Sequence, residues 1–204
     1  MIAKNFTVKK DDDRLMNHLK KISNPLLAWF RARARSLPWR DDPRPYYVWV
    51  SEIMLQQTRV AAVMPYFSRF VAALPDVGAL ASADGDALMK LWEGLGYYSR
   101  ARNLKKAAQV VMEKYGGAIP RDFDKLLALP GVGRYTAGAI ASIAYGARVP
   151  AVDGNVLRVV ARLTASREDV LREKTKCAVE AALAATDSSM ATRGIVVCPP
   201  GAMA

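Results

Sequence analysis

The sequence predicts an all-α fold, and three observations support this prediction. Apolar residues recur at three- and four-residue steps along almost the whole chain from Tyr46 onward. No segment shows the clear alternation of apolar and polar residues that is typical of a half-buried strand. Glycine and proline interrupt the helical segments at short intervals, which indicates many helices of modest length joined by turns. The 204 residues are 51% hydrophobic, enough for one large core or two small ones.

The N-terminal part is expected to begin with a flexible extension, residues 1–24, because its first half is polar and highly charged. Asn24 and Pro25 then offer an N-cap and a first helical residue. A short basic helix is expected over residues 25–36. A proline-rich turn follows it.

The middle of the chain carries the strongest helical periodicity. We expect Pro65 to split one helical segment in two, Ser82 or Asp84 to cap another, and Gly116–Gly117 to end a third. The last segment, residues 186–204, has neither a helical stripe nor a strand pattern and is expected to be an irregular tail. Helical stripes cover residues 60–74, 88–95, 101–115, 123–127, 137–144, 156–163 and 170–185.

The charge balance favours a polyanionic partner. Thirty Lys and Arg face 19 Asp and Glu, giving a net charge of +11 and a pI near 9.8. The single histidine and two cysteines argue against histidine-based chemistry and against a disulfide framework. The start of the chain does not resemble a secretory signal, and no apolar run has the length of a membrane helix. A soluble protein of a reducing compartment is expected.

The string LPGVGRYTAGAI, residues 129–140, indicates a hairpin between two helices. Gly131 and Gly133 flank Val132 and permit a tight turn in which backbone N–H groups approach phosphate oxygens. Arg134 adds a positive charge at the start of the second helix. An ordinary helix–turn–helix connection is the alternative explanation of the same string.

Two carboxylates stand in strings that suggest catalysis. Glu52, in WVSEIMLQQT, lies within an apolar stretch, where burial would raise its pKa and suit a general acid. The alternative is a glutamate on a helix surface that points to water. Asp153, in VDGNV, precedes a helix by one glycine. Here the alternative is a simple turn, with Asn155 as the helix cap.

Two further strings combine amides and aromatic rings near turns. Gln56-Gln57-Thr58 follows the Glu52 segment, and GLGYY, residues 94–98, contains Tyr97 and Tyr98. Such groups can wedge into a base stack and hold a duplex open. A tyrosine pair packed in the core is the alternative.

Taken together, WVSEIMLQQT, GLGYYSRARNL, LPGVGRYTAGAI and VDGNVLRV resemble the helix–hairpin–helix superfamily of base-excision DNA glycosylases, most closely its MutY-type adenine-specific branch. The resemblance covers about residues 25–165 in family order. It implies a DNA-binding cleft between two helical domains. Residues 41–146 would form a six-helix barrel with the hairpin, and residues 25–40 with 147–185 would form a second, incomplete iron–sulfur domain.

The resemblance also implies roles for individual residues. Glu52 and Asp153 match the catalytic carboxylates, Tyr135 and Asn155 match their active-site neighbours, and Arg40 matches a neighbour that contacts DNA. Gln57 and Tyr97 match residues that enter the base stack, and Gly131, Val132, Gly133 and Arg134 match the hairpin that holds the DNA backbone. Basic side chains such as Arg100 and Arg102 are further candidate phosphate contacts.

The implied substrate is double-stranded DNA containing adenine mispaired with 8-oxoguanine or guanine. Lyase-type relatives carry a nucleophilic lysine where this sequence has Tyr135, and a phenol cannot form a Schiff base. A monofunctional glycosylase of base-excision repair is therefore expected, acting as a monomer in a bacterial cytoplasm near the nucleoid. The alternatives are a catalytically impaired DNA-binding fragment, or a related glycosylase acting on mismatched thymine or an oxidised pyrimidine.

The resemblance departs from the family near the C-terminus. Members of this family carry four cysteines that bind a 4Fe–4S cluster, whereas Cys198 is the only candidate ligand here, and Cys177 lies on a helix stripe as an expected core residue. No cofactor is therefore expected for this chain. A C-terminal truncation or a shifted reading frame is expected to explain the missing ligands.

Overall fold

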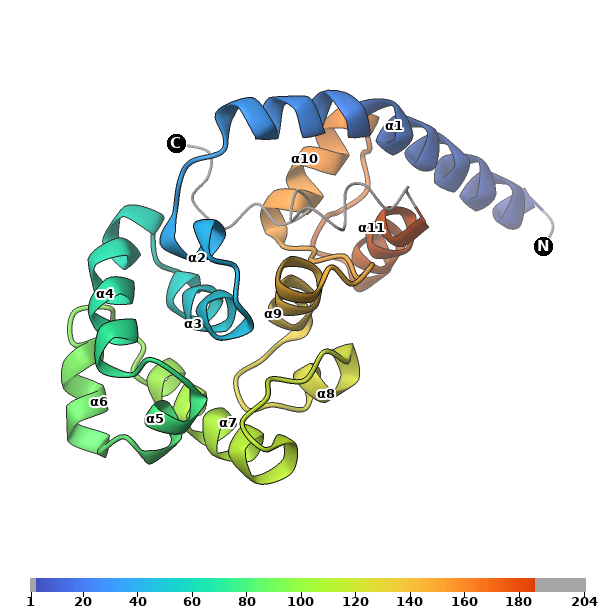
Figure 1. The fold of residues 1–204 in the computed structure, drawn as a ribbon. Helices are drawn as coiled ribbons and strands as arrows, with labels where there is room; N and C mark the ends of the chain where they lie inside the picture. The colour runs from blue at the N-terminus through green and yellow to red at the C-terminus, as the bar shows by residue number, and fades with distance from the viewer. Residues whose placement is uncertain (1–2, 186–204) are drawn as a thin grey trace.

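The computed structural model describes residues 3–185, and all regular structure within that range is helical, as the sequence predicts (Figure 1). Among the described residues, no helix combines the length and apolar composition that crossing a membrane requires. The helices are α1 (Ala3–Arg33), α2 (Pro38–Asp41), α3 (Pro45–Leu55), α4 (Val60–Ala73), α5 (Val77–Ser82), α6 (Gly85–Trp92), α7 (Ser99–Tyr115), α8 (Phe123–Leu127), α9 (Arg134–Ala139), the π-helical turn η1 (Ile140–Ala144), α10 (Gly154–Thr164) and α11 (Glu173–Ala185).

The N-terminal part corrects the prediction. Residues 1–24 were expected to be flexible, with a helix beginning at Pro25, but α1 runs from Ala3 to Arg33 with Pro25 inside it. The physical reason is a distant contact, since Leu19 is fully buried against residues of α10 and α11. That burial outweighs the local N-cap signal of Asn24 and the helix-breaking tendency of Pro25.

The larger of two main hydrophobic clusters is built around α3. This helix contacts α4, α7, α9 and η1, and every residue from Val48 to Leu55 in it is buried. The aromatic rings of Trp39 and Phe67 pack edge to face, with centroids 5.0 Å apart. Trp39 thus joins this cluster, although the sequence analysis grouped residues 25–40 with the second domain.

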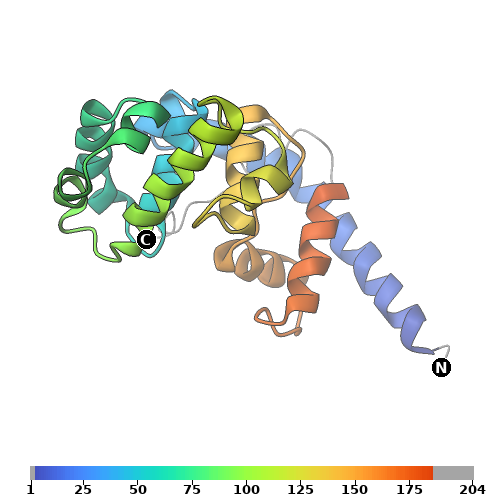
Figure 2. The same cartoon turned by 90° about the horizontal axis from the view of Figure 1, so that it is seen from below.

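The smaller cluster joins the two ends of the described chain. It contains Leu19 of α1, Leu157 and Val160 of α10, and Val179 and Leu183 of α11. Figure 2 shows α1 running beside α11 and extending beyond it at its N-terminal end. The division of the chain into two domains remains an interpretation, with which two separate clusters are compatible.

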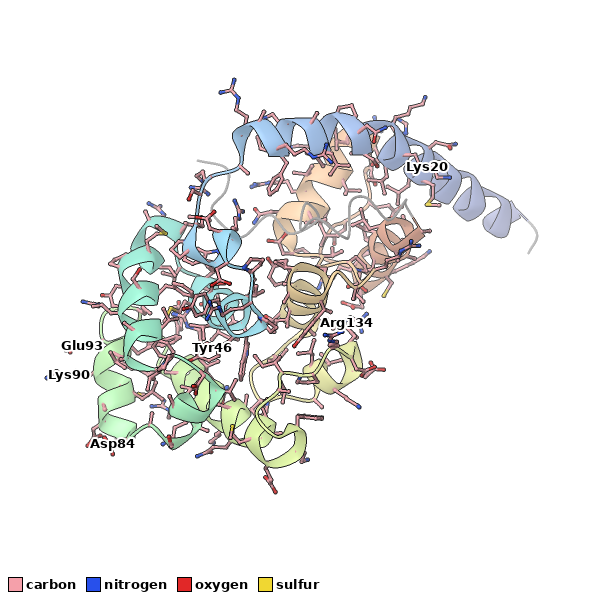
Figure 3. All side chains as sticks on the ribbon, in the orientation of Figure 1. Lys20, Tyr46, Asp84, Lys90, Glu93 and Arg134 are labelled. Atoms are coloured by element: carbon pink, nitrogen blue, oxygen red, sulfur yellow. The ribbon has the colours of Figure 1, made fainter. Side chains whose placement is uncertain are left out.

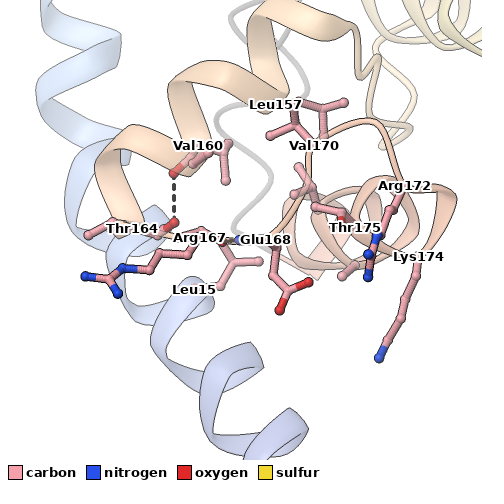
Figure 4. A pocket seen from close by; sticks show the side chains of 15 residues that line it. Leu15, Leu157, Val160, Thr164, Arg167, Glu168, Val170, Arg172, Lys174 and Thr175 are labelled. Carbon is pink, nitrogen blue, oxygen red and sulfur yellow. Dashed lines mark hydrogen bonds between the residues drawn. The ribbon is translucent and has the colours of Figure 1, made fainter.

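A pocket of about 600 Å³ opens between α1, α10 and α11 at the edge of the smaller cluster. Figure 4 shows Leu15 of α1 facing Leu157 and Val160 of α10 across it. The Thr164 hydroxyl donates a hydrogen bond to the Val160 carbonyl, 2.9 Å away.

Local signals predicted most other helix ends. Asp84 caps α6 through hydrogen bonds from the backbone amides of Asp86 and Ala87, and Gly116 ends α7 in the left-handed conformation. The expected break at Pro65 is wrong, because α4 continues through it with Val63 and Phe67 packed in the core. The last helix begins at Glu173 rather than at residue 170.

Candidate functional site

Glu52 is buried in the middle of α3, with 4% of its surface exposed. Burial raises the pKa of its carboxyl group to about 7, while a hydrogen bond with Tyr135 and the charge of Arg40 oppose that rise. The alternative of a glutamate pointing to water is therefore wrong. A carboxyl group of this kind is protonated in about half of the molecules near neutral pH, as a general acid requires.

Asp153 lies within electrostatic reach of Glu52, because its negative charge raises the Glu52 pKa further. It caps α10 by accepting a hydrogen bond from the Val156 amide at 2.8 Å, and the Asn155 side-chain amide donates to its other oxygen at 2.9 Å. Asp153 rather than Asn155 is thus the helix cap. The two hydrogen bonds fix the half-buried carboxylate at the start of α10.

Tyr135 and Arg40 reach Glu52 from two other elements. Tyr135 lies in the first turn of α9, and Arg40 lies in α2, with its guanidinium 5.7 Å from the centroid of the Phe30 ring. Both residues lower the pKa of Glu52 and so limit the effect of its burial. The structure therefore brings together Glu52, Asp153, Tyr135, Asn155 and Arg40, which the sequence analysis had assigned to one site.

The hairpin has the predicted geometry. Gly131 adopts a φ of 76°, and a Cβ there would lie 2.8 Å from the Asn103 Cβ, so only glycine fits this turn. Val132 is buried beneath the turn. Gly133 is the N-cap of α9, and no side chain caps that helix. Its first N–H groups are therefore open to an anion such as a phosphate.

Arg134 stands at the start of α9 and is labelled in Figure 3, where it lies between α9 and α8. Its guanidinium forms a 2.9 Å ion pair with Glu180 of α11 and lies 5.6 Å from the centroid of the Phe123 ring. The side chain is 60% exposed, so this ion pair contributes little to stability and can be exchanged for a phosphate.

An open groove of about 960 Å³ continues from Arg134 past Asp153 along α10 and α11. Its lining is of mixed charge, with four basic and three acidic side chains. Its charged lining residues are Arg134, Asp153, Arg158, Arg162, Glu173, Lys176 and Glu180.

Gln57 and Tyr97 are exposed and lie on separate loops, and both adopt positive φ angles, 58° and 47°. Left-handed backbone is unusual for residues other than glycine and is often found at functional sites. Tyr97 is 62% exposed and Tyr98 39%, so the tyrosine pair is not part of the core.

Arg100 corrects the sequence analysis. It was expected to contact phosphate, but it is 8% exposed and donates hydrogen bonds to backbone carbonyls of the loops that carry Gln57 and Tyr97. Local sequence did not show this, because the acceptors on Ile53, Met54 and Gln56 lie 44 to 47 residues earlier in the chain. Arg102, two residues later, is exposed as expected.

Gly138 is a second position that the sequence analysis missed. A Cβ on this residue of α9 would lie 2.6 Å from the carbonyl oxygen of Pro150. The absence of a side chain therefore lets α9 pack directly against the segment that leads to Asp153. This close packing sets the distance between Tyr135 and Asp153, which lie on the two sides of the contact.

No ligand set for an iron–sulfur cluster lies within residues 3–185. The described part contains no group of three or more His, Cys, Asp or Glu side chains that could hold a metal. Cys177, which was expected in the core, is exposed. Cys198 and the tail, residues 186–204, lie outside the described residues, so the expectation that the chain lacks a cofactor stays an expectation.

Comparison with known proteins gives one family. Residues 50–185 match the model of the HhH-GPD superfamily base excision DNA repair protein. The chain is 50% identical over 153 residues to the adenine DNA glycosylase of Mus musculus, covering 71% of this chain and 30% of that relative. It is 40% identical over 178 residues to the adenine DNA glycosylase of Mycolicibacterium smegmatis, covering 87% of this chain and 61% of that relative. The chain thus spans less than two thirds of the length of these relatives.

Solved structures show the same fold. A thermostable thymine-DNA glycosylase superposes with a TM-score of 0.75 at 25% identity, covering 88% of this chain and 84% of that one. Endonuclease III trapped covalently on DNA superposes with a TM-score of 0.73 at 26% identity, covering 89% of this chain and 84% of that one. With the hairpin and the buried acid in place, the chain belongs to the HhH-GPD superfamily of base-excision DNA repair proteins and has its helix–hairpin–helix glycosylase fold.

Proposed function

We propose that this chain is a monofunctional DNA glycosylase that hydrolyses the N-glycosidic bond of adenine mispaired with 8-oxoguanine or guanine. The observation that carries the proposal is a buried Glu52 with a pKa of about 7, held beside the carboxylate of Asp153. Two carboxyl groups with different environments are what cleavage of a glycosidic bond requires. The adenine DNA glycosylases to which the chain is similar support adenine as the base.

The chemistry assigns one step to each carboxyl group. Protonated Glu52 donates its proton to N7 of adenine, so that the bond from the base to C1′ breaks and the electron pair leaves with a neutral base. Ionised Asp153 stabilises the positive charge that develops on the sugar. Water then adds its oxygen to C1′ and returns a proton to Glu52, giving free adenine and an intact abasic strand.

Two features support double-stranded DNA as the partner. The reaction requires that the deoxyadenosine be flipped out, because the glycosidic bond is inaccessible in a stacked duplex, and flipping costs least at a mispair. Gln57 and Tyr97 are exposed on strained loops from which they can enter the stack. The uncapped start of α9 and the exposed Arg134 at that point can hold phosphates without reading sequence.

Tyr135 supports hydrolysis without strand cleavage. A phenol cannot form the imine through which lyase-type glycosylases cut the strand. Borohydride should therefore trap no covalent complex with DNA. We further propose that the enzyme acts as a monomer in the cytoplasm, at the nucleoid, where its substrate lies.

The test compares the chain with its Glu52→Gln variant on a duplex containing adenine opposite 8-oxoguanine. The chain should release adenine in a single turnover, whereas the variant should bind the duplex with similar affinity and release none. Equal binding without release by the unmodified chain would instead identify a catalytically impaired DNA-binding fragment. Two further duplexes, one with a mismatched thymine and one with an oxidised pyrimidine, complete the test. Release of either base, with no release of adenine from the first duplex, would identify the related glycosylase.

A further inference from the structure

We infer that Arg100 is a positioning residue that holds Gln57 and Tyr97 in the conformations in which they enter the base stack. This inference rests on the proposed function, because it assigns these two side chains to the opened duplex. Arg100 itself touches neither DNA nor the reacting atoms. Its role is to tie together the two loops from which they project.

The contacts of Arg100 reach both loops at once. At the end of α3, its Nη1 donates to the carbonyl oxygens of Ile53 at 3.1 Å and Met54 at 2.9 Å, and also to that of Gln56. In the second loop, its Nη2 donates to the carbonyl oxygens of Leu95 at 2.9 Å and Gly96 at 3.2 Å. The Thr58 hydroxyl oxygen lies 3.4 Å from both nitrogens.

The acceptors stand immediately next to the two strained residues. Gln56 precedes Gln57, and Gly96 precedes Tyr97, so the guanidinium fixes the peptide group that enters each left-handed residue. A left-handed conformation in a residue with a side chain persists only where its surroundings hold it. Arg100 supplies that hold for both residues from one buried point.

Two aromatic rings add to the contacts of Arg100 with the two loops, and we call the whole set of contacts the clamp. The guanidinium carbon lies 5.5 Å from the centroid of the Trp92 ring and 5.5 Å from that of the Tyr97 ring. The indole N–H of Trp92 also donates to the carbonyl oxygen of Gly96 at 3.1 Å. Tyr97 is thus held through its ring as well as through its backbone.

Arginine is needed here, and lysine would not replace it. The planar guanidinium offers a rigid fork of N–H donors, whereas an ammonium group has three donors around one atom. A lysine can keep the charge and reach one loop, but it cannot bridge both. Arg100→Lys therefore removes the bridge while it keeps the charge and most of the volume.

The first experiment measures the loops without DNA. In Arg100→Lys, amide hydrogen exchange should rise at residues 56–58 and 95–98 and stay unchanged in the core of α3 and α7. Unchanged exchange in both loops would overturn the inference. Arg102→Lys, an exposed arginine two residues along α7, is the matched control and should leave the exchange unchanged.

The second experiment is a double-mutant cycle on adenine release in a single turnover. Tyr97→Ala should slow release about tenfold in the unmodified chain, the size of one lost stacking contact. In the Arg100→Lys background it should slow release less than about twofold, because the wedge is already misplaced. Two effects that simply multiply would assign Arg100 to folding alone.

A 2-aminopurine base beside the mispair separates this inference from the proposed function. Its fluorescence should rise when the unmodified chain opens the duplex, and Arg100→Lys should lose that rise. If the unmodified chain opens the duplex but releases no adenine, the proposed function fails while the clamp stands. If Arg100→Lys keeps the full rise, the clamp fails.

A second variant covers the case in which Arg100→Lys does not fold. Trp92→Phe removes the N–H donor to the Gly96 carbonyl and keeps an aromatic ring beside the guanidinium. Exchange should rise at residues 95–98 and not at residues 56–58. The absence of any change in the second loop would contradict the clamp.

Discussion

At the scale of single residues, the ionisation of Glu52 connects burial with chemistry. A carboxyl group in an apolar environment favours its neutral form, and Tyr135 and Arg40 limit that preference. The balance leaves its pKa at about 7, where the group can both donate and accept a proton. The position of Glu52 was predictable from its apolar neighbours, but the strength of the opposing groups was not, since they come from α9 and α2.

The rate of adenine release should fall as the pH rises through about 7. Above that value Glu52 is ionised and has no proton to give, so the single-turnover rate should drop about tenfold for each further pH unit. Rates measured between pH 5.5 and 9 on one duplex test this expectation. A flat profile across that range would show that Glu52 is not the acid.

Glu52→Gln should make the protein more stable at alkaline pH and leave it nearly unchanged at acid pH. The pKa of the Glu52 carboxyl group rises on folding from 4.5 to about 7. Its contribution to the free energy of unfolding is therefore fully present below pH 4.5 and is lost as the pH rises through about 7. The variant should therefore gain up to about 3 kcal/mol at pH 8, since each unit of pKa shift corresponds to about 1.4 kcal/mol.

Urea unfolding at pH 4.5 and pH 8 measures this difference. Glu113→Gln, an exposed position on α7, serves as the matched control and should change stability by less than about 0.5 kcal/mol at either pH. An equal effect of Glu52→Gln at the two pH values would contradict the raised pKa.

At the scale of helices and loops, the site depends on contacts between backbones. α9 carries Tyr135, and Asp153 caps the start of α10, so the distance between these two residues is set where Gly138 meets Pro150. Replacing that glycine changes no catalytic group. It moves one catalytic segment relative to another.

Gly138→Ala should slow adenine release strongly while lowering stability moderately. The new Cβ would lie 2.6 Å from the Pro150 carbonyl oxygen, so the segment leading to Asp153 must shift. A displacement of about 1 Å can slow catalysis about 100-fold, and overpacking costs about 1–3 kcal/mol. Release rate and thermal unfolding are measured together.

Gly85→Ala is the matched control, because nothing lies within 4 Å of a Cβ at that position in α6. It should leave both quantities unchanged. If a folded Gly138→Ala protein released adenine at the rate of the unmodified chain, the site would tolerate a shift of the segment that leads to Asp153.

The sequence predicted these elements where the signal was local. The hairpin glycines, the Asp84 cap and the end of α7 at Gly116 each follow from a few neighbouring residues. The burial of Arg100 and the contact at Gly138 did not follow, because both depend on how separate segments pack in space. Arg100 donates to the Met54 carbonyl, 46 residues away in the sequence, and Gly138 meets Pro150 of the segment that leads to Asp153.

At the scale of the whole molecule, α1 shows the same limit more clearly. Asn24 and Pro25 are good local signals for a helix start, yet the helix begins at Ala3. The apolar stripe around Leu19 stabilises a helix only when α10 and α11 are present to bury it. Tertiary packing decided the structure of this segment.

Leu19→Ala should destabilise the smaller cluster by about 2–5 kcal/mol, since Leu19 is 1% exposed and its removal leaves a cavity. Hydrogen exchange should increase in α10 and α11 before it increases in the larger cluster. Lys20→Ala, at the exposed neighbouring position labelled in Figure 3, is the control and should have little effect. Uniform loss of protection across both clusters would show that they unfold as one unit.

The pairing of α1 with α11 has a consequence for biosynthesis. On the ribosome, Leu19 emerges long before Leu183, which is translated after both the larger cluster and α10. The larger cluster can fold before α11 is available, whereas the apolar stripe of α1 stays exposed to solvent until then. Chaperones that shield such stripes should therefore associate with the growing polypeptide until α11 has left the exit tunnel.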